Sequence, residues 1–234
     1  MLGDILSAGF QELGISCEIE AIANLRKYHT ILEETNKVMN LTAITGDEDV
    51  ARLHFLDCAA LLTLEDFTDK KVLDVGSGAG FPGMVLKIVN PKMDITLMDS
   101  LEKRVNFLKD LSQELKLEDV HCIHMRAEEA PPEFRQSYDI VVSRAVAKLE
   151  LLCELCLPFV KLGGKFIAMK GPAGADELKD AENAIKVLGG RYVETASYEI
   201  PGTDKKHNAV IIEKVAPTPA KYPRRWAQIK KAPL

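Results

Sequence analysis

The sequence predicts an α/β fold: a mostly parallel sheet with a final antiparallel strand pair, preceded by a helical cap. Two observations support this prediction. From residue 72 onward, short apolar runs typical of strands alternate with segments of helical periodicity. The first of these runs, 72–75, leads directly into a glycine-rich turn and an apolar helical segment, an arrangement typical of the opening βα unit of nucleotide-binding sheets.

Residues 1–68 are expected to form the helical cap. Apolar side chains recur there at helical spacing and define one face, formed by Ile22, Leu25, Tyr28, Ile31 and Leu32. Turn-forming residues at 40–46 interrupt the helical pattern, and a second amphipathic stretch covers 48–64. His54 lies on this second stretch, where a structural hydrogen bond is the favoured interpretation of its role.

Residues 69–215 are expected to form the main domain. Strands are predicted at 72–75, 94–99, 120–125, 138–143 and 165–170. Helices are predicted at 84–89, 101–116, 149–160 and 176–188, the last two followed by glycine pairs that end them. The antiparallel pair is predicted at 191–200 and 208–215. A proline-containing linker, 216–220, then opens the tail 216–234.

The composition is ordinary for a globular protein, with 47% hydrophobic and 28% charged residues in a chain of 234. No apolar run approaches the length of a membrane span, and the N-terminal residues lack the pattern of a secretory signal. The sequence also shows no coiled-coil pattern or apolar stripe that would favour self-association. We therefore expect a cytoplasmic monomer that does not contact a membrane.

The cysteines do not indicate a disulfide framework or a metal site. Their number, five, is odd, and their spacing is irregular. Cys153 and Cys156 form a C-x-x-C pair, but they lie in an apolar helical segment with no second ligand pair nearby. Packing in the core is the favoured interpretation, and no metal is expected.

The charge is unevenly distributed along the chain. The net charge is −5, yet residues 214–234 contain six Lys and Arg and no acid, which leaves 24 basic against 35 acidic residues elsewhere. A basic tail on an acidic body fits contact with a polyanion. A tail that only aids solubility would have the same composition.

The glycine-rich turn has the spacing Gly-x-Gly-x-Gly, beginning with Gly76 and Gly78. A dinucleotide fingerprint would need its third glycine at position 81, which is occupied by Phe81. Asp74 precedes the turn, where an anion is unfavourable beside a pyrophosphate but could pair with an ammonium group. S-adenosylmethionine (SAM) carries an ammonium group and no phosphate, so the pattern favours SAM. A turn that merely joins strand to helix is the alternative.

A second acid, Asp99, ends the strand 94–99, about twenty residues beyond the glycines. A carboxylate at this strand end can accept hydrogen bonds from both ribose hydroxyls of an adenosyl group. Capping of the helix that begins near Leu101 is the alternative role. The glycine turn and the acid occur in the required order and together predict a Rossmann-like SAM-binding domain.

Ligands bind such sheets at the carboxyl ends of the strands, near the topological switch point. This rule places on one rim residues 76–81, Asp99, 126–128, 143–145 and 170–171. Ala127 and Glu128 could flank an adenine ring, and Arg144 would face the cleft between cofactor and acceptor. The alternatives are a helix-start acid for Glu128 and a surface ion pair for Arg144.

Motifs spread over nearly the whole chain are similar to those of one known family. They lie at 40–44 (NLTAI), 54–57 (HFLD), 74–83 (DVGSGAGFPG), 99–104 (DSLEKR), 126–129 (RAEE), 143–147 (SRAVA) and 222–224 (YPR). In these segments the chain resembles the bacterial 16S ribosomal RNA guanine-N7 methyltransferase family, RsmG, also called GidB. The chain departs from the family at Cys58, where serine is usual, and at Asn36, where an aromatic residue is usual.

The resemblance implies a SAM-dependent enzyme that methylates N7 of a guanine in the 16S rRNA of the small ribosomal subunit. Carried over residue by residue, the cofactor contacts fall on Gly76, Phe81, Ala127, Glu128 and Arg144. The spacing argument adds Gly78 and Asp99. Guanine N7 already holds an in-plane lone pair, so methyl transfer requires no general base, and we assign no catalytic residue.

Cationic residues near the strand ends and in the tail are predicted to bind the RNA. Arg144 and Lys170 follow strands and are expected to position a phosphate or guanine O6. More distant RNA backbone would be held by Lys205, Lys206, Arg224 and Arg225.

Three other functions are compatible with parts of the sequence. A nicotinamide-dependent oxidoreductase shares the sheet and the strand-end acid but needs the third glycine. A non-catalytic ribosome-assembly factor could keep the fold and bind RNA without SAM. A SAM-dependent methyltransferase could also act on a small molecule or a protein, which would leave the basic tail without a role.

Overall fold

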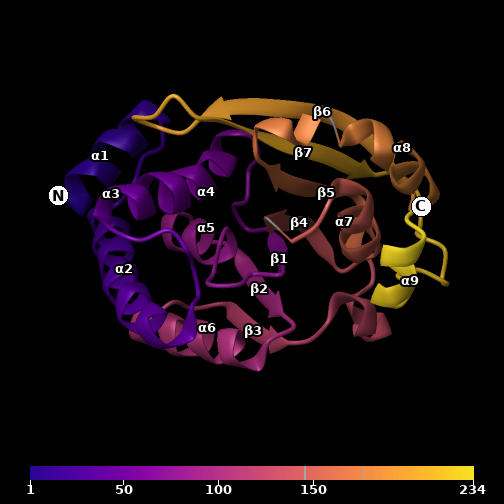
Figure 1. The fold of residues 1–234 in the computed structure, drawn as a ribbon, viewed down its shortest axis with the longest axis horizontal. Coiled ribbons are helices and arrows are strands. Elements are labelled where there is room, and N and C mark those ends of the chain that lie inside the picture. Colours follow the sequence, from indigo (N-terminus) through magenta and orange to yellow (C-terminus); the bar gives the residue numbers. More distant parts are fainter. Residues whose placement is uncertain (145, 176) are drawn as a thin grey trace.

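A computed structural model describes residues 1–144, 146–175 and 177–234. Ala145, on the predicted rim, and Asp176, the predicted start of a helix, lie outside the described residues. At the centre is a seven-stranded sheet with the strand order β3-β2-β1-β4-β5-β7-β6 (Figure 1). Its strands are β1 Lys71–Val75, β2 Asp94–Asp99, β3 Val120–His124, β4 Tyr138–Arg144, β5 Val160–Lys170, β6 Gly190–Glu199 and β7 Lys206–Lys214.

The pairing of the strands confirms the predicted fold class. Strands β1 to β5 pair in parallel with their neighbours, whereas β7 is antiparallel to both β5 and β6. The order reverses between β1 and β4, which lie side by side although two strands separate them in the chain. The carboxyl ends of these strands therefore form the switch point at which such sheets bind ligands.

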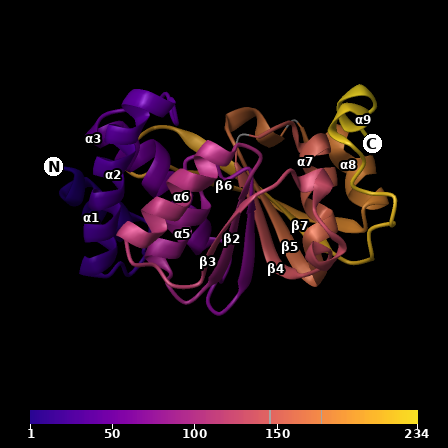
Figure 2. The same ribbon diagram turned by 90° about the horizontal axis from the view of Figure 1, so that it is seen from below.

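Helices cover both faces of the sheet (Figure 2). One face carries α1 Leu2–Glu12, α2 Ile19–Met39, α3 Asp47–Val50, α4 Asp57–Ala59, α5 Gly83–Val89 and α6 Glu102–Glu114; the other carries α7 Leu149–Cys156, α8 Leu178–Val187 and α9 Trp226–Lys231. Successive side chains of β1 alternate between the two cores, with Val72 in the first and Leu73 and Val75 in the second. No helix in the described ranges is long and apolar enough to cross a membrane.

The first 68 residues share one core with the sheet. Leu6 and Phe10 of α1 and Leu25 of α2 belong to the same buried cluster as Met84 and Ile95 of the sheet domain. The predicted second helix, 48–64, is not continuous. It consists of α3, a π-helical segment Ala51–Leu56, α4 and a 3₁₀ turn. The π-helical segment carries His54 and leads into Asp57, and such segments are frequent at functional sites.

Two predicted boundaries on the other face are wrong. The helix predicted at 149–160 ends at Cys156, because Pro158 lacks the N–H that would continue it, and a 3₁₀ turn leads straight into β5. The glycine pair 163–164 does not end an element but lies inside β5. A Cβ on Gly164 would come within 2.6 Å of the Asp139 carbonyl oxygen, so only glycine lets this strand approach β4.

The basic tail packs on the second core. Tyr222 and Ile229 are buried in it, and the buried carboxylate of Glu154 on α7 holds the Arg224 guanidinium through two oxygens. Cys153 and Cys156, on the same helix, are also buried, which confirms their predicted place in the core.

Asp74, at the end of β1, is fully buried beneath the glycine turn. Its Oδ2 accepts a hydrogen bond from the Gly83 amide at 2.9 Å, and its Oδ1 has no partner in the described structure. Burial raises the pKa of Asp74 to about 7. This geometry contradicts the expectation that Asp74 faces a ligand's ammonium group, because the carboxyl is turned toward the start of α5.

Asp74→Asn should therefore change how stability depends on pH. The pKa in the folded protein, about 7, lies above the ordinary value of 3.8, so the folded chain holds a proton that the unfolded chain releases between these values. The contribution of Asp74 to the free energy of unfolding is greatest below about pH 4 and falls as pH rises to 7, by at most about 1.4 kcal/mol per pH unit. Urea unfolding of both proteins between about pH 5 and pH 7.5 tests this prediction. A stability difference that does not vary with pH would contradict it.

Candidate active site

Two cavities adjoin at the carboxyl ends of the strands. The small cavity, about 230 Å³, lies at the ends of β1, β2 and β3. The large cavity, about 720 Å³, lies between the ends of β4, β5 and β7 and the cap. Val146, directly after β4, lines both. The molecule therefore offers two neighbouring binding spaces at the switch point.

Four of the predicted cofactor residues line the small cavity: Gly76, Asp99, Ala127 and Glu128. They lie at or just after the ends of three strands, β1, β2 and β3, which the parallel sheet brings to one edge. The Glu128 carboxylate accepts a hydrogen bond from Arg126 at 2.8 Å. The rule that ligands bind at the carboxyl ends of parallel strands, applied to the sequence, therefore located this cavity.

The Asp99 carboxylate holds the glycine turn against β2. Its Oδ2 accepts from the Gly78 amide at 2.8 Å, and its Oδ1 accepts from the Leu101 amide at 2.9 Å. The second bond is a turn contact before α6 and not the helix cap considered as the alternative, because Leu101 is itself the N-cap residue and no side chain caps this helix. Each carboxylate oxygen has two lone pairs, so the side chain retains acceptor capacity for hydroxyl groups in the cavity.

Two glycines of the turn, Gly76 and Gly80, leave no room for a side chain. Gly76 has φ +77°, and a Cβ there would come within 2.5 Å of the Val146 side chain. Gly80 has φ +106°, and its Cβ would come within 2.6 Å of the Tyr28 hydroxyl. The Tyr28 hydroxyl donates to the Ala79 carbonyl oxygen, so α2 of the cap is hydrogen-bonded to the glycine turn and holds it in place.

Phe81 lies in a stack of rings beside the large cavity, which its neighbour His54 lines. Its ring is 4.1 Å from that of His54, at 16° between planes, and 5.6 Å from that of Tyr28. The Arg144 guanidinium carbon is 5.1 Å from the Phe81 ring centroid. Phe81 therefore supports His54 and Arg144. Phe81 is not among the described residues that line either cavity.

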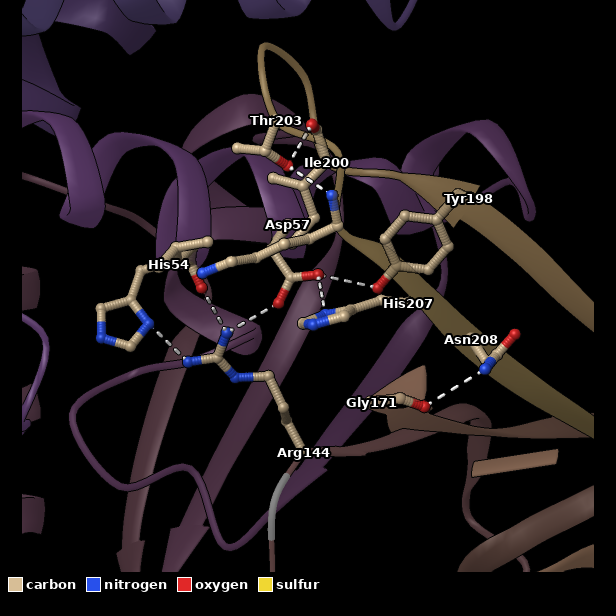
Figure 3. A network of polar contacts seen from close by, with 11 residues as sticks. His54, Asp57, Arg144, Gly171, Tyr198, Ile200, Thr203, His207 and Asn208 are labelled. Carbon is tan, nitrogen blue, oxygen red and sulfur yellow. Dashed lines mark hydrogen bonds and ion pairs between the residues drawn. The ribbon is translucent and has the colours of Figure 1, made fainter. Parts of the chain in front are cut away.

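Arg144, at the end of β4, points into the cap (Figure 3). Its Nη1 donates to Asp57 Oδ2 at 3.0 Å and to the Leu53 carbonyl oxygen at 3.2 Å, and its Nη2 is 2.7 Å from His54 Nδ1. Its side chain is 16% exposed and that of Asp57 is 2% exposed. The alternative of a surface ion pair is therefore wrong, because this pair is largely buried while Arg144 still lines the large cavity.

Asp57 joins four elements, and the sequence analysis missed it as a site residue. Besides the bond from Arg144, its Oδ1 accepts from the Tyr198 hydroxyl and from His207 Nδ1, each at 2.9 Å (Figure 3). The spacing of His54 and Asp57, three residues apart, was the one available signal, since it puts both on one side of a helix. Tyr198 and His207 gave no such signal.

His54 is held as a neutral imidazole. Burial, together with the positive charge of Arg144, lowers its pKa to about 3. Because Arg144 donates to Nδ1, the proton of the neutral ring is on Nε2, which lies 2.8 Å from the Thr42 hydroxyl. Asn36, the departure from the family pattern, in turn bonds both backbone groups of Thr42 at 2.9 Å.

The predicted RNA-binding cations differ in their exposure and in whether they line the large cavity. Lys170 and Lys205 line the large cavity, where the Lys170 ammonium donates to Glu177 at 2.8 Å. Lys206 is exposed and pairs with Glu199 at 3.1 Å. Arg224 is bound to Glu154, whereas Arg225 is exposed. In the described ranges no three His, Cys, Asp or Glu side chains form a group that could hold a metal.

Solved structures share this fold at low sequence identity. A putative methyltransferase from Bacillus halodurans superposes with a TM-score of 0.55 at 12% identity, over 68% of this chain and 99% of that one. TrmN from Thermus thermophilus gives 0.53 at 20% identity, over 68% and 48% of the two chains. TYW2 from M. jannaschii, in complex with AdoMet, gives 0.51 at 15% identity, over 64% and 72%. These likenesses confirm the predicted Rossmann-like methyltransferase fold.

Sequence similarity extends over the whole chain. The family model GidB, described as rRNA small subunit methyltransferase G, matches residues 21–207. Ribosomal RNA small subunit methyltransferase G of Clostridium tetani is 45% identical over 99% of this chain and 98% of its own length. The protein of that name from Alkaliphilus metalliredigens is 48% identical over 98% of each. The resemblance inferred from the motifs is thereby confirmed, and the chain belongs to the rRNA small subunit methyltransferase G family.

Proposed function

We propose that this protein transfers the methyl group of SAM to N7 of a guanine in the 16S rRNA of the small ribosomal subunit. The observation that carries the proposal is the pair of adjoining cavities in a chain of this family. Four predicted cofactor residues line one cavity, and Arg144, Lys170 and Lys205 are among the residues that line the other. The substrate is a cytoplasmic particle in bacteria, and we propose that the protein acts there as a monomer.

The residues of the small cavity fit the adenosyl part of SAM. The Ala127 amide and the Glu128 carboxylate would bind the adenine edge, and Asp99 would accept from the ribose hydroxyls. Gly76 and Gly78 bring bare backbone to the remaining part of the cofactor, and the contacts of Gly76 show that any side chain there would fill the space. Phe81 and Arg144 would support the end of the cofactor that points toward the large cavity. When bound, SAM supplies an electrophilic methyl group.

The large cavity fits the acceptor, and its residues act by orientation. Guanine N7 offers its lone pair without losing a proton, so no general base is required. Correct alignment of two reactants can by itself supply roughly 7–11 kcal/mol of the barrier. Arg144 has one position because Asp57, His54 and Leu53 hold it, and we propose that Arg144 and Lys170 bind a phosphate or guanine O6. His54 stays neutral and takes no part in proton transfer.

Exposed cations around the large cavity and the tail would bind the RNA backbone. Lys205 lines the cavity mouth, and Lys206 and Arg225 are exposed. The Arg224 guanidinium is held by the buried Glu154 through Nε and Nη2, which leaves its Nη1 for a phosphate, and the exposed Arg225 lies next to it. Phosphate contacts of this kind position an RNA without reading its sequence.

Methyl transfer from radiolabelled SAM tests the reaction and its site together. Small subunits and stripped 16S rRNA, both from a strain lacking its own enzyme of this family, should become labelled, and nucleoside digestion with mass spectrometry should identify 7-methylguanosine. Arg144→Gln should abolish most of the labelling, whereas Arg191→Gln, on the exposed edge strand β6, should not change it. Label on another base would refute the N7 assignment. SAM binding without labelled RNA would indicate a different acceptor, and RNA binding without SAM affinity would indicate an assembly factor.

Arg225→Ala should weaken RNA binding uniformly across sequences. The logarithm of the RNA association constant falls linearly with the logarithm of the salt concentration. Loss of one phosphate contact makes this slope less steep by about 0.7 for single-stranded and about 0.9 for duplex nucleic acid. Filter binding of 16S rRNA at several salt concentrations measures this slope, with Arg191→Ala as the matched control because Arg191 is also exposed but lies on β6. An unchanged slope for Arg225→Ala would exclude Arg225 as an RNA contact.

A further inference from the structure

Trp226, the single tryptophan of the chain, lines the small cavity. It is the first residue of α9, in the basic tail, more than one hundred residues beyond the strands β1, β2 and β3 whose ends form much of the cavity. Ala127, Glu128 and Asp99 line the same space. A residue from the tail is therefore part of the wall that surrounds the predicted adenosyl site.

The tail is fixed on both sides of Trp226. Two residues before it, Arg224 bonds to the buried Glu154 carboxylate through its backbone amide at 2.7 Å, through Nε at 2.9 Å and through Nη2 at 2.6 Å. Three residues after it, Ile229 is fully buried in the second core. Trp226 is itself half-buried and packs against that core. Its position is therefore set by the fold and not by an unattached chain end.

The anchor of the tail and the cavity wall are built from the same turn of α7. Glu154 holds Arg224, and the next residue, Leu155, lines the small cavity together with Trp226. Breaking the Glu154–Arg224 pair would leave a buried carboxylate without its cation, which strongly disfavours release of the tail. The indole thus stays beside Leu155 at the cavity surface.

We propose that Trp226 closes the adenine end of the cofactor pocket and packs its ring against the adenine of SAM. This inference rests on the proposed function, since it assigns a ligand part to the same cavity. An indole offers a large flat π-face to a base, and such stacking is independent of hydrogen-bond pattern. Ala127 and Glu128 then read the adenine edge while Trp226 covers the ring, so the tail contributes to cofactor binding as well as to RNA binding.

The fluorescence of the wild-type protein tests the proposal directly, because all tryptophan emission comes from Trp226. Titration with S-adenosylhomocysteine should change the emission, with the same Kd that calorimetry gives. Trp226→Ala should raise the calorimetric Kd at least about fivefold, the lower limit for loss of one base–aromatic stack, and Trp226→Phe should raise it less. Gln228→Ala, an exposed position on the same helix, is the matched control and should leave the Kd unchanged.

The outcomes separate this inference from the proposed function. Calorimetric binding with unchanged emission, or with an unchanged Kd in Trp226→Ala, would overturn the role of Trp226 and leave the methyltransferase proposal intact. Absence of calorimetric binding to the wild-type protein, for both S-adenosylhomocysteine and SAM, would overturn both. The emission experiment needs no variant, so it decides the question even if Trp226→Ala does not fold.

Discussion

The buried ion pair between Asp57 and Arg144 is the interaction on which the site depends. Removing two charges from water is unfavourable, and the pair is stable only because its other hydrogen-bonding groups are also satisfied. Asp57 accepts from Arg144, Tyr198 and His207, and the Arg144 guanidinium also meets the Leu53 carbonyl oxygen and His54. The pair thereby connects the cap, the end of β4 and the strands β6 and β7 at one point beside the large cavity.

This connection makes the cap a part of the candidate active site. Thr42 contacts His54, His54 stacks on Phe81, and Tyr28 bonds to Ala79 in the glycine turn. The segments 40–44 and 54–57 of the cap meet the glycine turn, 74–83, in a single polar and aromatic cluster. A site held in this way is suited to a reaction that depends on alignment, because the supporting side chains have one arrangement.

Local patterns predicted most of the fold and residues of both cavities, Arg144 and Lys170 among those of the large one. Alternating apolar runs located the strands, and the rule for parallel sheets located the small cavity through Gly76, Asp99 and Glu128. The contacts of Asp57 could not be predicted, because Tyr198 and His207 are 141 and 150 residues away in the chain. The position of Trp226 in the small cavity could not be predicted for the same reason. It depends on how the tail packs on α7, and the sequence of a short basic segment does not indicate where that segment packs.

A double-mutant cycle at Asp57 and Arg144 measures whether this ion pair holds the cap to the sheet. The free energy of unfolding in urea would be measured for the wild type, for Asp57→Asn, for Arg144→Gln and for the double variant. Each single variant leaves a buried group without its partner, whereas the double variant removes both charges, so we expect a coupling free energy of at least about 1 kcal/mol. Additive effects, within about 0.5 kcal/mol, would show that the pair does not hold the cap to the sheet.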